Sequence, residues 1–280
     1  MSDPTGKSLT LDLLSTLRGG SMPIAALVAA SELFNVAEGS LRVAVTRLVA
    51  AGQVERDERG RYRLGEAAAP VTHRLGNWRQ IDERTCNWSG SWIGVNLGAG
   101  GRGADRRRSE RALRWHGFEE LIPGLRVRPD NLRGGVAGQR ETLRSLGLEP
   151  KALVLRLDEL DSHADQRARH LWDAQALERG YRDSLRELAE SEARLEQDSE
   201  AQAMVESFLL GGRIIRQLVL DPLLPKPLID PEPRRTLVRA MLRYDRRGRR
   251  SWAAFMERHG APHTRNPVHT GGGEPLPALV

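Results

Sequence analysis

The feature of the sequence that most restricts the fold is an apolar stripe within residues 38–51. Its members recur at intervals of three and four residues, at Leu41, Ala44, Val45 and Leu48. This spacing is that of an α-helix with one buried side. Shorter helical patterns at 8–17 and 23–35 precede it. Pro23 fits the first position of the second helix, and Asn35 can take the left-handed conformation that ends it.

A hairpin pattern follows the third predicted helix directly. Gly52 ends that helix, and two short runs at 53–56 and 61–64 flank a turn at 57–60. Three short helices followed by a hairpin are the layout of a winged helix-turn-helix domain. We therefore predict such a DNA-binding domain over residues 1–70.

The predicted outer side of the third helix carries side chains suited to DNA. The major groove admits one helix, while the hairpin of such a domain lies along phosphates. Arg42 can donate two hydrogen bonds to guanine, Val43 can contact a thymine methyl group, and Ser40 and Thr46 can bond bases or phosphates. Hairpin arginines would neutralise backbone phosphates. The predicted DNA-binding residues are Ser40, Arg42, Val43, Thr46 and Arg47 on the helix and Arg56, Arg59 and Arg61 on the hairpin.

A different pattern begins after residue 87. Residues 71–87 are predicted to be a linker, and residues 88–165 alternate short strand and helix patterns in the order β-α-β-β-α-β. This order is that of a ferredoxin-like domain, here expected to form a dimer. The predicted strands cover 91–97, 120–122, 125–127 and 152–157, and the predicted helices cover 105–116 and 138–146.

A glycine-rich loop follows the first of these strands. Residues 98–103 satisfy the G-x-G-x-x-G pattern of dinucleotide-binding loops, with Glu119 and Glu120 downstream as candidate ribose ligands. The following helix carries too many charges to pack on a parallel sheet, and no further βαβαβ repeat follows. A loop that binds no cofactor is the favoured interpretation.

Residues 166–260 are predicted to form an all-helical C-terminal domain. Asp173 can cap its first helix, and the proline-rich run 221–227 ends its second. Residues 261–280 have the composition of a disordered tail. The chain is thus predicted to be a multidomain α+β protein. The predicted C-terminal helices cover 173–197, 201–220, 234–244 and 251–259.

Composition restricts the class of protein further. Of 280 residues, 39% are hydrophobic, yet no run reaches the roughly 18 apolar residues of a membrane-spanning helix. Residues 1–7 lack a signal-peptide pattern, so we expect a soluble, cytoplasmic protein. Cys86 stands alone, which excludes an internal disulfide framework. The net charge of +6 is spread thinly, so any nucleic-acid surface has to be local.

The sequence contains no recognisable catalytic or metal-binding pattern. The seven histidines lack the helical i, i+4 pair of a metal site, and Cys86 has no recognisable base partner. We therefore predict no enzyme activity, no cofactor and no metal site. The arginine-rich run 246–250, followed by Trp252 and Phe255, could bind a phosphorylated ligand or DNA. The alternative is a solvated loop between two helices.

Several separated blocks match one protein family in its own order. The most specific is the run G-L-R-V-R-P-D-N-L at residues 124–132. The others are the run 41–52, the segment 111–118, the element Leu171-Trp172-Asp173 with Tyr181, and the element 221–225. Together these blocks, spread over roughly residues 8–245, resemble PaaX-type repressors of phenylacetate degradation.

The resemblance implies a homodimeric transcriptional repressor. Such proteins combine an N-terminal winged helix with a Cas2-like, ferredoxin-like middle domain and a helical C-terminal domain. They bind inverted repeats at promoters and are released by an aryl-CoA thioester, typically phenylacetyl-CoA. Carried onto this chain, the resemblance implies a recognition helix at 38–51, with Arg42, Thr46 and Arg47 at its motif positions, and a palindromic operator.

The chain departs from the family pattern at two places, and two other functions stay open. Asn35 replaces a glycine, and residues 228–234 lack the tryptophan and glycine expected there, which affects the expected effector more than DNA binding. A Cas2-like metal-dependent nuclease would need an acidic residue at the end of the first middle-domain strand. This sequence has Asn96 and Leu97 there and Asp105 only beyond the loop. The third possibility is an adaptor whose winged helix contacts proteins and whose arginine side is merely solvated.

Overall fold

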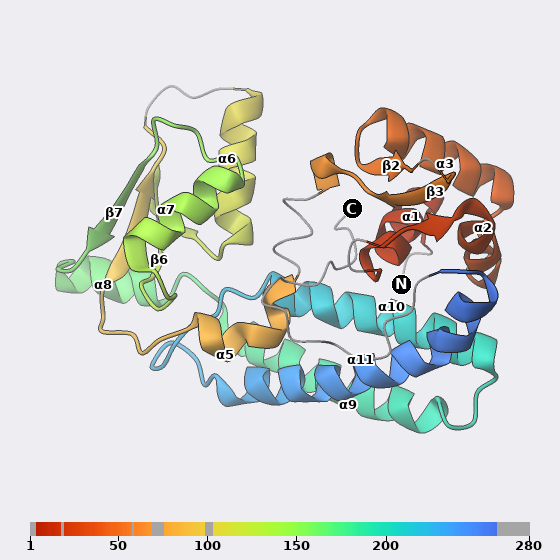
Figure 1. The fold of residues 1–280 in the computed structure, drawn as a ribbon. Coiled ribbons are helices and arrows are strands. Elements are labelled where there is room, and N and C mark those ends of the chain that lie inside the picture. Colours follow the sequence, from red (N-terminus) through yellow and green to blue (C-terminus); the bar gives the residue numbers. More distant parts are fainter. Residues whose placement is uncertain (1–3, 18–19, 58, 69–75, 99–102, 262–280) are drawn as a thin grey trace. The chain divides into compact units, whose positions relative to one another are not determined.

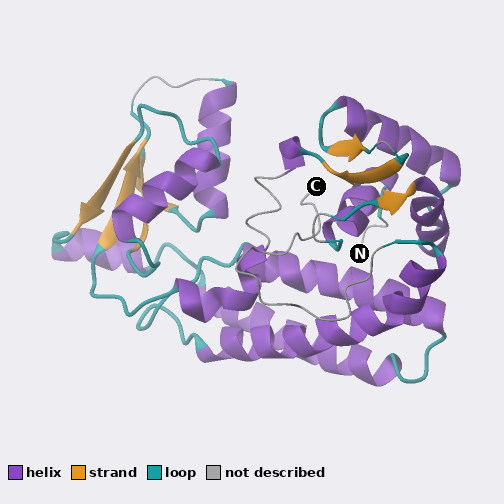
Figure 2. Ribbon diagram, in the orientation of Figure 1, coloured by secondary structure: helices purple, strands orange, loops and turns teal. Residues whose placement is uncertain are grey.

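The structure is a computed structural model that describes residues 4–17, 20–57, 59–68, 76–98 and 103–261. It is a mixed α+β structure with two small sheets and a helical C-terminal region (Figure 1, Figure 2). The chain divides into two compact units. Unit 1 consists of Met1–Arg79, Arg186–Val219 and Arg239–Val280, and unit 2 consists of Gln80–Leu185 and Leu220–Val238. The predicted domain boundaries at residues 70, 87, 165 and 260 stay predictions.

Unit 1 begins with three helices, α1 (Gly6–Ser15), α2 (Ile24–Leu33) and α3 (Glu38–Ala50). A capping box starts α1, in which the hydroxyl of Thr5 accepts the backbone N–H of Ser8 at 3.2 Å. Asn35 has a φ of 56° after α2, which confirms the predicted left-handed residue. The apolar sides of the three helices meet in one core that includes Leu9, Leu27 and Leu41.

The hairpin of unit 1 acquires a third strand. The predicted pair is present as β2 (Val54–Arg56) and β3 (Arg61–Leu64), and β1 (Met22–Pro23) pairs antiparallel with β3. The prediction that Pro23 is the first residue of a helix is wrong. With a ψ of 149°, Pro23 is extended and precedes α2, because its backbone pairs with Arg61.

The C-terminal helices of unit 1 pack against this core. α10 (Glu200–Val219) contributes Phe208 and α11 (Glu232–Arg258) contributes Trp252, and both rings lie against Phe34. Two separate helices were expected where α11 is continuous. Gly248 lies inside this helix without ending it. A Cβ at this position would lie 3.0 Å from the Cβ of Ser207, so a larger residue would clash with α10. The glycine thus permits close approach of α10 and α11 and repays its helix cost of about 1 kcal/mol.

Unit 2 is built on the four-stranded antiparallel sheet with the order β5-β6-β4-β7. Alternate side chains of a strand point to opposite faces. Ile93 packs with Leu113 and Leu143 on one face, whereas Trp92 packs with Ala168 on the other. The predicted β-α-β-β-α-β order is present as β4 (Trp92–Asn96), α6 (Ala104–Trp115), β5 (Glu119–Ile122), β6 (Leu125–Pro129), α7 (Gly135–Ser145) and β7 (Leu153–Leu157), followed by α8 (Ser162–Arg169).

The remaining elements are connections and one long helix. The part of the predicted linker that is described contains the 3-10 helix η2 (Gly76–Gln80) and α5 (Ile81–Arg84), and η1 (Glu66–Ala68) precedes it. Asp173 accepts the backbone N–H of Ala176 at 2.8 Å at the start of α9 (Ala174–Arg194), which confirms the predicted cap. Residues 71–75 of the predicted linker, most of the glycine loop and residues 262–280 lie outside the described residues. No helix in the described part of the chain is both long and apolar enough to span a bilayer.

Candidate nucleic-acid interface

Helix α3 has one buried and one exposed side. Leu41, Val45 and Leu48 are at most 3% exposed and hold the helix in the core of unit 1. The opposite side is open, and Val43 is 51% exposed. The structure therefore brings five predicted residues together on one accessible surface, which consists of Ser40, Arg42, Val43, Thr46 and Arg47. We call this surface the α3 face.

The polar groups of the α3 face are only weakly engaged. Arg42 donates from Nε to Glu38 Oε1 at 2.7 Å, and both side chains are about half exposed. Exposed ion pairs of this kind contribute about 0–1 kcal/mol, so Arg42 can exchange this carboxylate for a base or a phosphate. The hydroxyl of Thr46 donates to the carbonyl of Arg42 at 3.0 Å and can still accept. Arg47 is exposed and has no polar partner among the described residues.

The turn of the hairpin displays two further arginines. Arg56 and Arg59 are exposed, and neither guanidinium has a polar partner in the described part of the chain. Asp57 shapes the turn by accepting the backbone N–H groups of Arg59 at 3.0 Å and Arg61 at 2.8 Å. The bond from Arg61 is the main reason that the pKa of Asp57 is lowered. Sequence analysis did not single out Asp57 or Glu38, although an aspartate opening a turn and an i, i+4 pair were visible signals.

Arg61 has a different environment from the other predicted residues. Its guanidinium donates to the hydroxyl of Ser21 at 3.0 Å, to the carbonyl of Ser21 at 2.7 Å and to the carbonyl of Gly260 at 2.8 Å. These bonds hold the side chain against its own unit. We therefore do not retain Arg61 as a phosphate contact. Sequence analysis missed this because the pairing of β1 with β3, which brings Ser21 beside Arg61, is not a local pattern.

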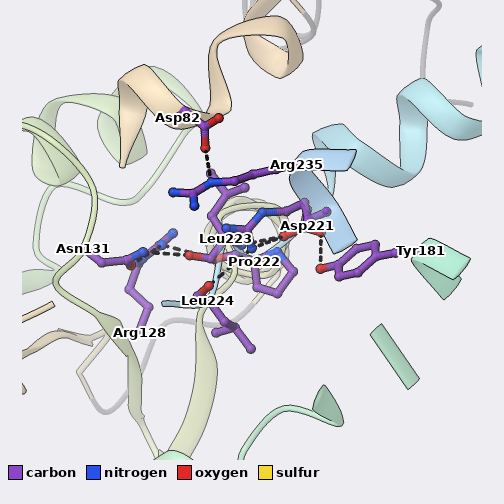
Figure 3. A network of polar contacts seen from close by, with 10 residues as sticks. Asp82, Arg128, Asn131, Tyr181, Asp221, Pro222, Leu223, Leu224 and Arg235 are labelled. Atoms are coloured by element: carbon purple, nitrogen blue, oxygen red, sulfur yellow. Dashed lines mark hydrogen bonds and ion pairs between the residues drawn. The ribbon is translucent and has the colours of Figure 1, made fainter. Parts of the chain in front are cut away.

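A second concentration of polar residues lies buried in unit 2 (Figure 3). Arg128 is 2% exposed and donates to the carbonyls of His116, Pro129 and Pro222. Asn131 donates to the carbonyl of Leu223 at 2.7 Å. The blocks 124–132 and 221–225, which sequence analysis found to be family-like, therefore bind each other.

Asp221 is the centre of the same cluster. Its carboxylate accepts the hydroxyl of Tyr181 at 2.6 Å, the backbone N–H of Leu223 at 2.8 Å and Nη1 of Arg234 at 3.4 Å. Burial raises the pKa of Asp221, and the charge of Arg234 acts in the opposite direction. Burial, together with Asp221, also raises the pKa of Tyr181. Each carboxylate oxygen accepts at least one bond from this chain, which indicates a structural role for Asp221. We call Arg128, Asn131, Tyr181, Asp221 and Arg234 the Asp221 cluster.

The positions considered for metal or cofactor binding can be compared with their surroundings only in the described part of the chain. Within the described residues, no group of three or more histidine, cysteine or acidic side chains could hold a metal ion. Asn96 ends β4 and accepts the backbone N–H of Gly98 at 2.6 Å, while the exposed Asp105 pairs with Arg108. β4 has antiparallel neighbours on both sides, whereas a dinucleotide-binding loop requires a parallel βαβ unit. Residues 99–102 of the loop lie outside the described residues.

Comparisons with known proteins match the regions that contain the block 41–52, Trp172-Asp173 with Tyr181, and the block 221–225, whereas the blocks 111–118 and 124–132 lie outside the matched residues. The family described as PaaX-like protein matches residues 5–68, and the PaaX-like protein C-terminal domain matches residues 172–256. No curated protein matches. The solved structure of the uncharacterized protein Rv0674 from Mycobacterium tuberculosis is similar in fold, with a TM-score of 0.61 and 24% sequence identity over 90% of this chain and 99% of that chain. The two family matches together take in more than half of the sequence. The chain belongs to the PaaX-like protein family.

Proposed function

We propose that this protein is a sequence-specific DNA-binding transcriptional regulator. The observation that carries the proposal is the α3 face, an exposed helical surface with two arginines, two hydroxyl groups and an exposed valine. In this proposal, the three helices and the hairpin of unit 1 form a winged helix-turn-helix. α3 enters the major groove, where Arg42 bonds to guanine and Val43 contacts a thymine methyl group.

The hairpin acts as the wing and contacts the DNA backbone. Arg56 and Arg59 extend from it without acidic partners among the described residues, and each can neutralise a phosphate. Such contacts carry no base preference, but they fix the register of the protein on the duplex. The bonds from Asp57 to the turn support this role, because they hold Arg59 at the tip of the wing.

The regulator acts as a homodimer on a palindromic operator. The antiparallel order β5-β6-β4-β7, with α6 and α7 between the strands in sequence, supports a ferredoxin-like domain in unit 2. We assign dimer formation to this domain. A two-fold dimer places its recognition helices on half-sites whose centres lie about 10 base pairs apart, or a multiple of that distance.

Ligand binding controls the affinity for the operator. Membership of the PaaX-like family supports a cytoplasmic repressor that an aryl-CoA thioester, such as phenylacetyl-CoA, releases from DNA. The ligand weakens DNA binding to the extent that it favours the dimer geometry in which the two α3 helices are misplaced.

A gel-shift experiment with the promoter region upstream of the protein's own gene tests the proposal. We expect retardation of this DNA in preference to a random duplex, and release by one member of a panel of aryl-CoA thioesters. Equal retardation of all DNA would contradict the sequence-specific role. Release by none of the thioesters would contradict the effector class alone. Magnesium-dependent cleavage that is lost in Asp105→Ala would show a nuclease instead.

A further inference from the structure

Helix α11 carries a row of arginines that the proposed recognition surface does not use. Arg239, Arg243, Arg246 and Arg250 follow one another at intervals of four, three and four residues, so their side chains lie on one side of the helix. All four are exposed and belong to unit 1. At a rise of 1.5 Å per residue, the row extends about 16 Å along the helix axis. We call these residues the α11 row.

The opposite side of α11 is fully used in packing, which fixes the direction of the row. Met241 and Tyr244 are each 1% exposed. Trp252 donates from its indole nitrogen to the carbonyl of Met204 at 3.1 Å, and Gly248 lies against Ser207. Because these contacts hold α11 on α10, the row cannot turn inward and stays available to a partner.

Three members of the row carry charges that no described residue neutralises, unlike those of neighbouring arginines. Arg247 pairs with Glu196 at 2.9 Å and Arg258 pairs with Glu200 at 3.3 Å. By contrast, Arg243, Arg246 and Arg250 have no hydrogen-bond or ion-pair partner among the described residues. Like charges three and four residues apart on a helix repel each other. This repulsion therefore destabilises α11 in the free protein, and a bound anion would relieve it.

The length of the row favours an extended anion over a compact one. Phosphates of one DNA strand recur about every 3.4 Å along the duplex axis. The three members of the row without a partner, Arg243, Arg246 and Arg250, span about 10 Å of helix and can therefore face more than one phosphate. A small phosphorylated ligand would occupy only part of the row. We propose that the α11 row binds the phosphate backbone of duplex DNA without base preference. This inference rests on the proposed function and adds a second contact surface to the unit that carries the α3 face.

The test compares two variants of the full chain with the same loss of charge. R243Q/R246Q/R250Q removes the three unpaired members of the row. R194Q/R247Q/R258Q removes three arginines that pair with Glu206, Glu196 and Glu200. The affinity for a random-sequence duplex of about 30 base pairs is measured by fluorescence anisotropy between 50 and 200 mM salt.

Three lost phosphate contacts reduce the slope of log affinity against log salt by about 2.7. Over this fourfold range of salt, the affinity of the wild type should therefore fall about 40-fold more than that of the row variant. The control variant should follow the wild type, and R243K/R246K/R250K should restore the slope. Thermal unfolding should show a row variant at least as stable as the wild type, because repulsion has been removed.

A wild-type slope in the row variant would overturn the inference, as would an equal loss in the control variant, which would show an effect of net charge alone. Binding of coenzyme A that disappears in the row variant, with an unchanged DNA slope, would assign the row to a compact ligand instead. Preference for promoter over random DNA is measured in parallel. If the wild type prefers promoter DNA and the row variant has the same salt slope as the wild type, only this inference fails. If the wild type shows no preference for promoter DNA but the row variant has a smaller salt slope than the wild type, the proposed function fails and the row remains a DNA contact.

Discussion

The α3 face and the Asp221 cluster are both rich in charged and polar side chains, yet they serve opposite purposes. Arg128 in the cluster is 2% exposed and bonds to several carbonyls of its own chain. Arg42 on the α3 face has a side chain that is 53% exposed and holds one exchangeable carboxylate. The difference shows that an arginine indicates a binding surface only when its own chain does not already supply its partners.

The largest expected effect is a loss of stability in a variant of the Asp221 cluster, which a variant of the exposed α3 face should not show. Asp221→Asn keeps the shape of the side chain but leaves the buried guanidinium of Arg234 without its carboxylate. Breaking such a pair costs about 3–5 kcal/mol, so the free energy of unfolding in urea should fall by that amount. The more exposed pair of Asp82 and Arg235 is the matched control, and Asp82→Asn should cost less than about 1 kcal/mol. Equal losses of unfolding free energy in both variants would show that the buried pair stabilises the protein no more than the exposed pair does.

The next effect concerns base preference. Arg42→Ala should weaken operator binding by about 1–3 kcal/mol and relax the preference at one base position, because a bidentate contact with guanine is lost. Unfolding should be almost unchanged, since Arg42 is exposed and alanine favours helices. Competition between operator and random duplexes measures the preference. An equal loss of affinity for operator and random duplexes would show that Arg42 contacts only a phosphate.

The hairpin offers a comparison between two neighbouring arginines. Arg59→Ala should weaken binding to all sequences alike and lower the salt slope by about 0.9. Arg61→Ala should leave that slope unchanged and lower the free energy of unfolding by about 1 kcal/mol, because the bonds to Ser21 and Gly260 are lost. Salt titrations and urea unfolding of both variants provide the measurements. A reduced salt slope in Arg61→Ala would show that Arg61 contacts a DNA phosphate after all.

The smallest effect sharpens the view of the α3 face itself. Glu38→Gln removes the carboxylate that holds Arg42, and it also removes a negative charge near DNA. Affinity for every duplex should rise by a few-fold, equivalent to less than about 1 kcal/mol. Anisotropy at low salt detects the change. Unchanged or weaker binding would show that Glu38 positions Arg42 for recognition.

Local patterns in the sequence were sufficient for most individual elements. The stripe of Leu41, Val45 and Leu48 predicted α3, and the order of strands and helices in 88–165 was confirmed. Asp173 and Asn35 were assigned correctly, because caps and left-handed residues depend on the few residues around them. The exposed position of the α3 face followed from the same periodicity.

Only the tertiary structure decided which side chains meet across long separations. The bond from Arg128 to Pro222 spans 94 residues, and the bond from Arg61 to Gly260 spans 199. Two helices were predicted on either side of the run 246–250, whereas Gly248 lies within the continuous α11 and packs against Ser207. The sequence by itself determined where helices and strands form, because periodicity and capping act over one or two turns. Whether an arginine is buried, paired or free depends on packing between distant segments, and no local pattern records that.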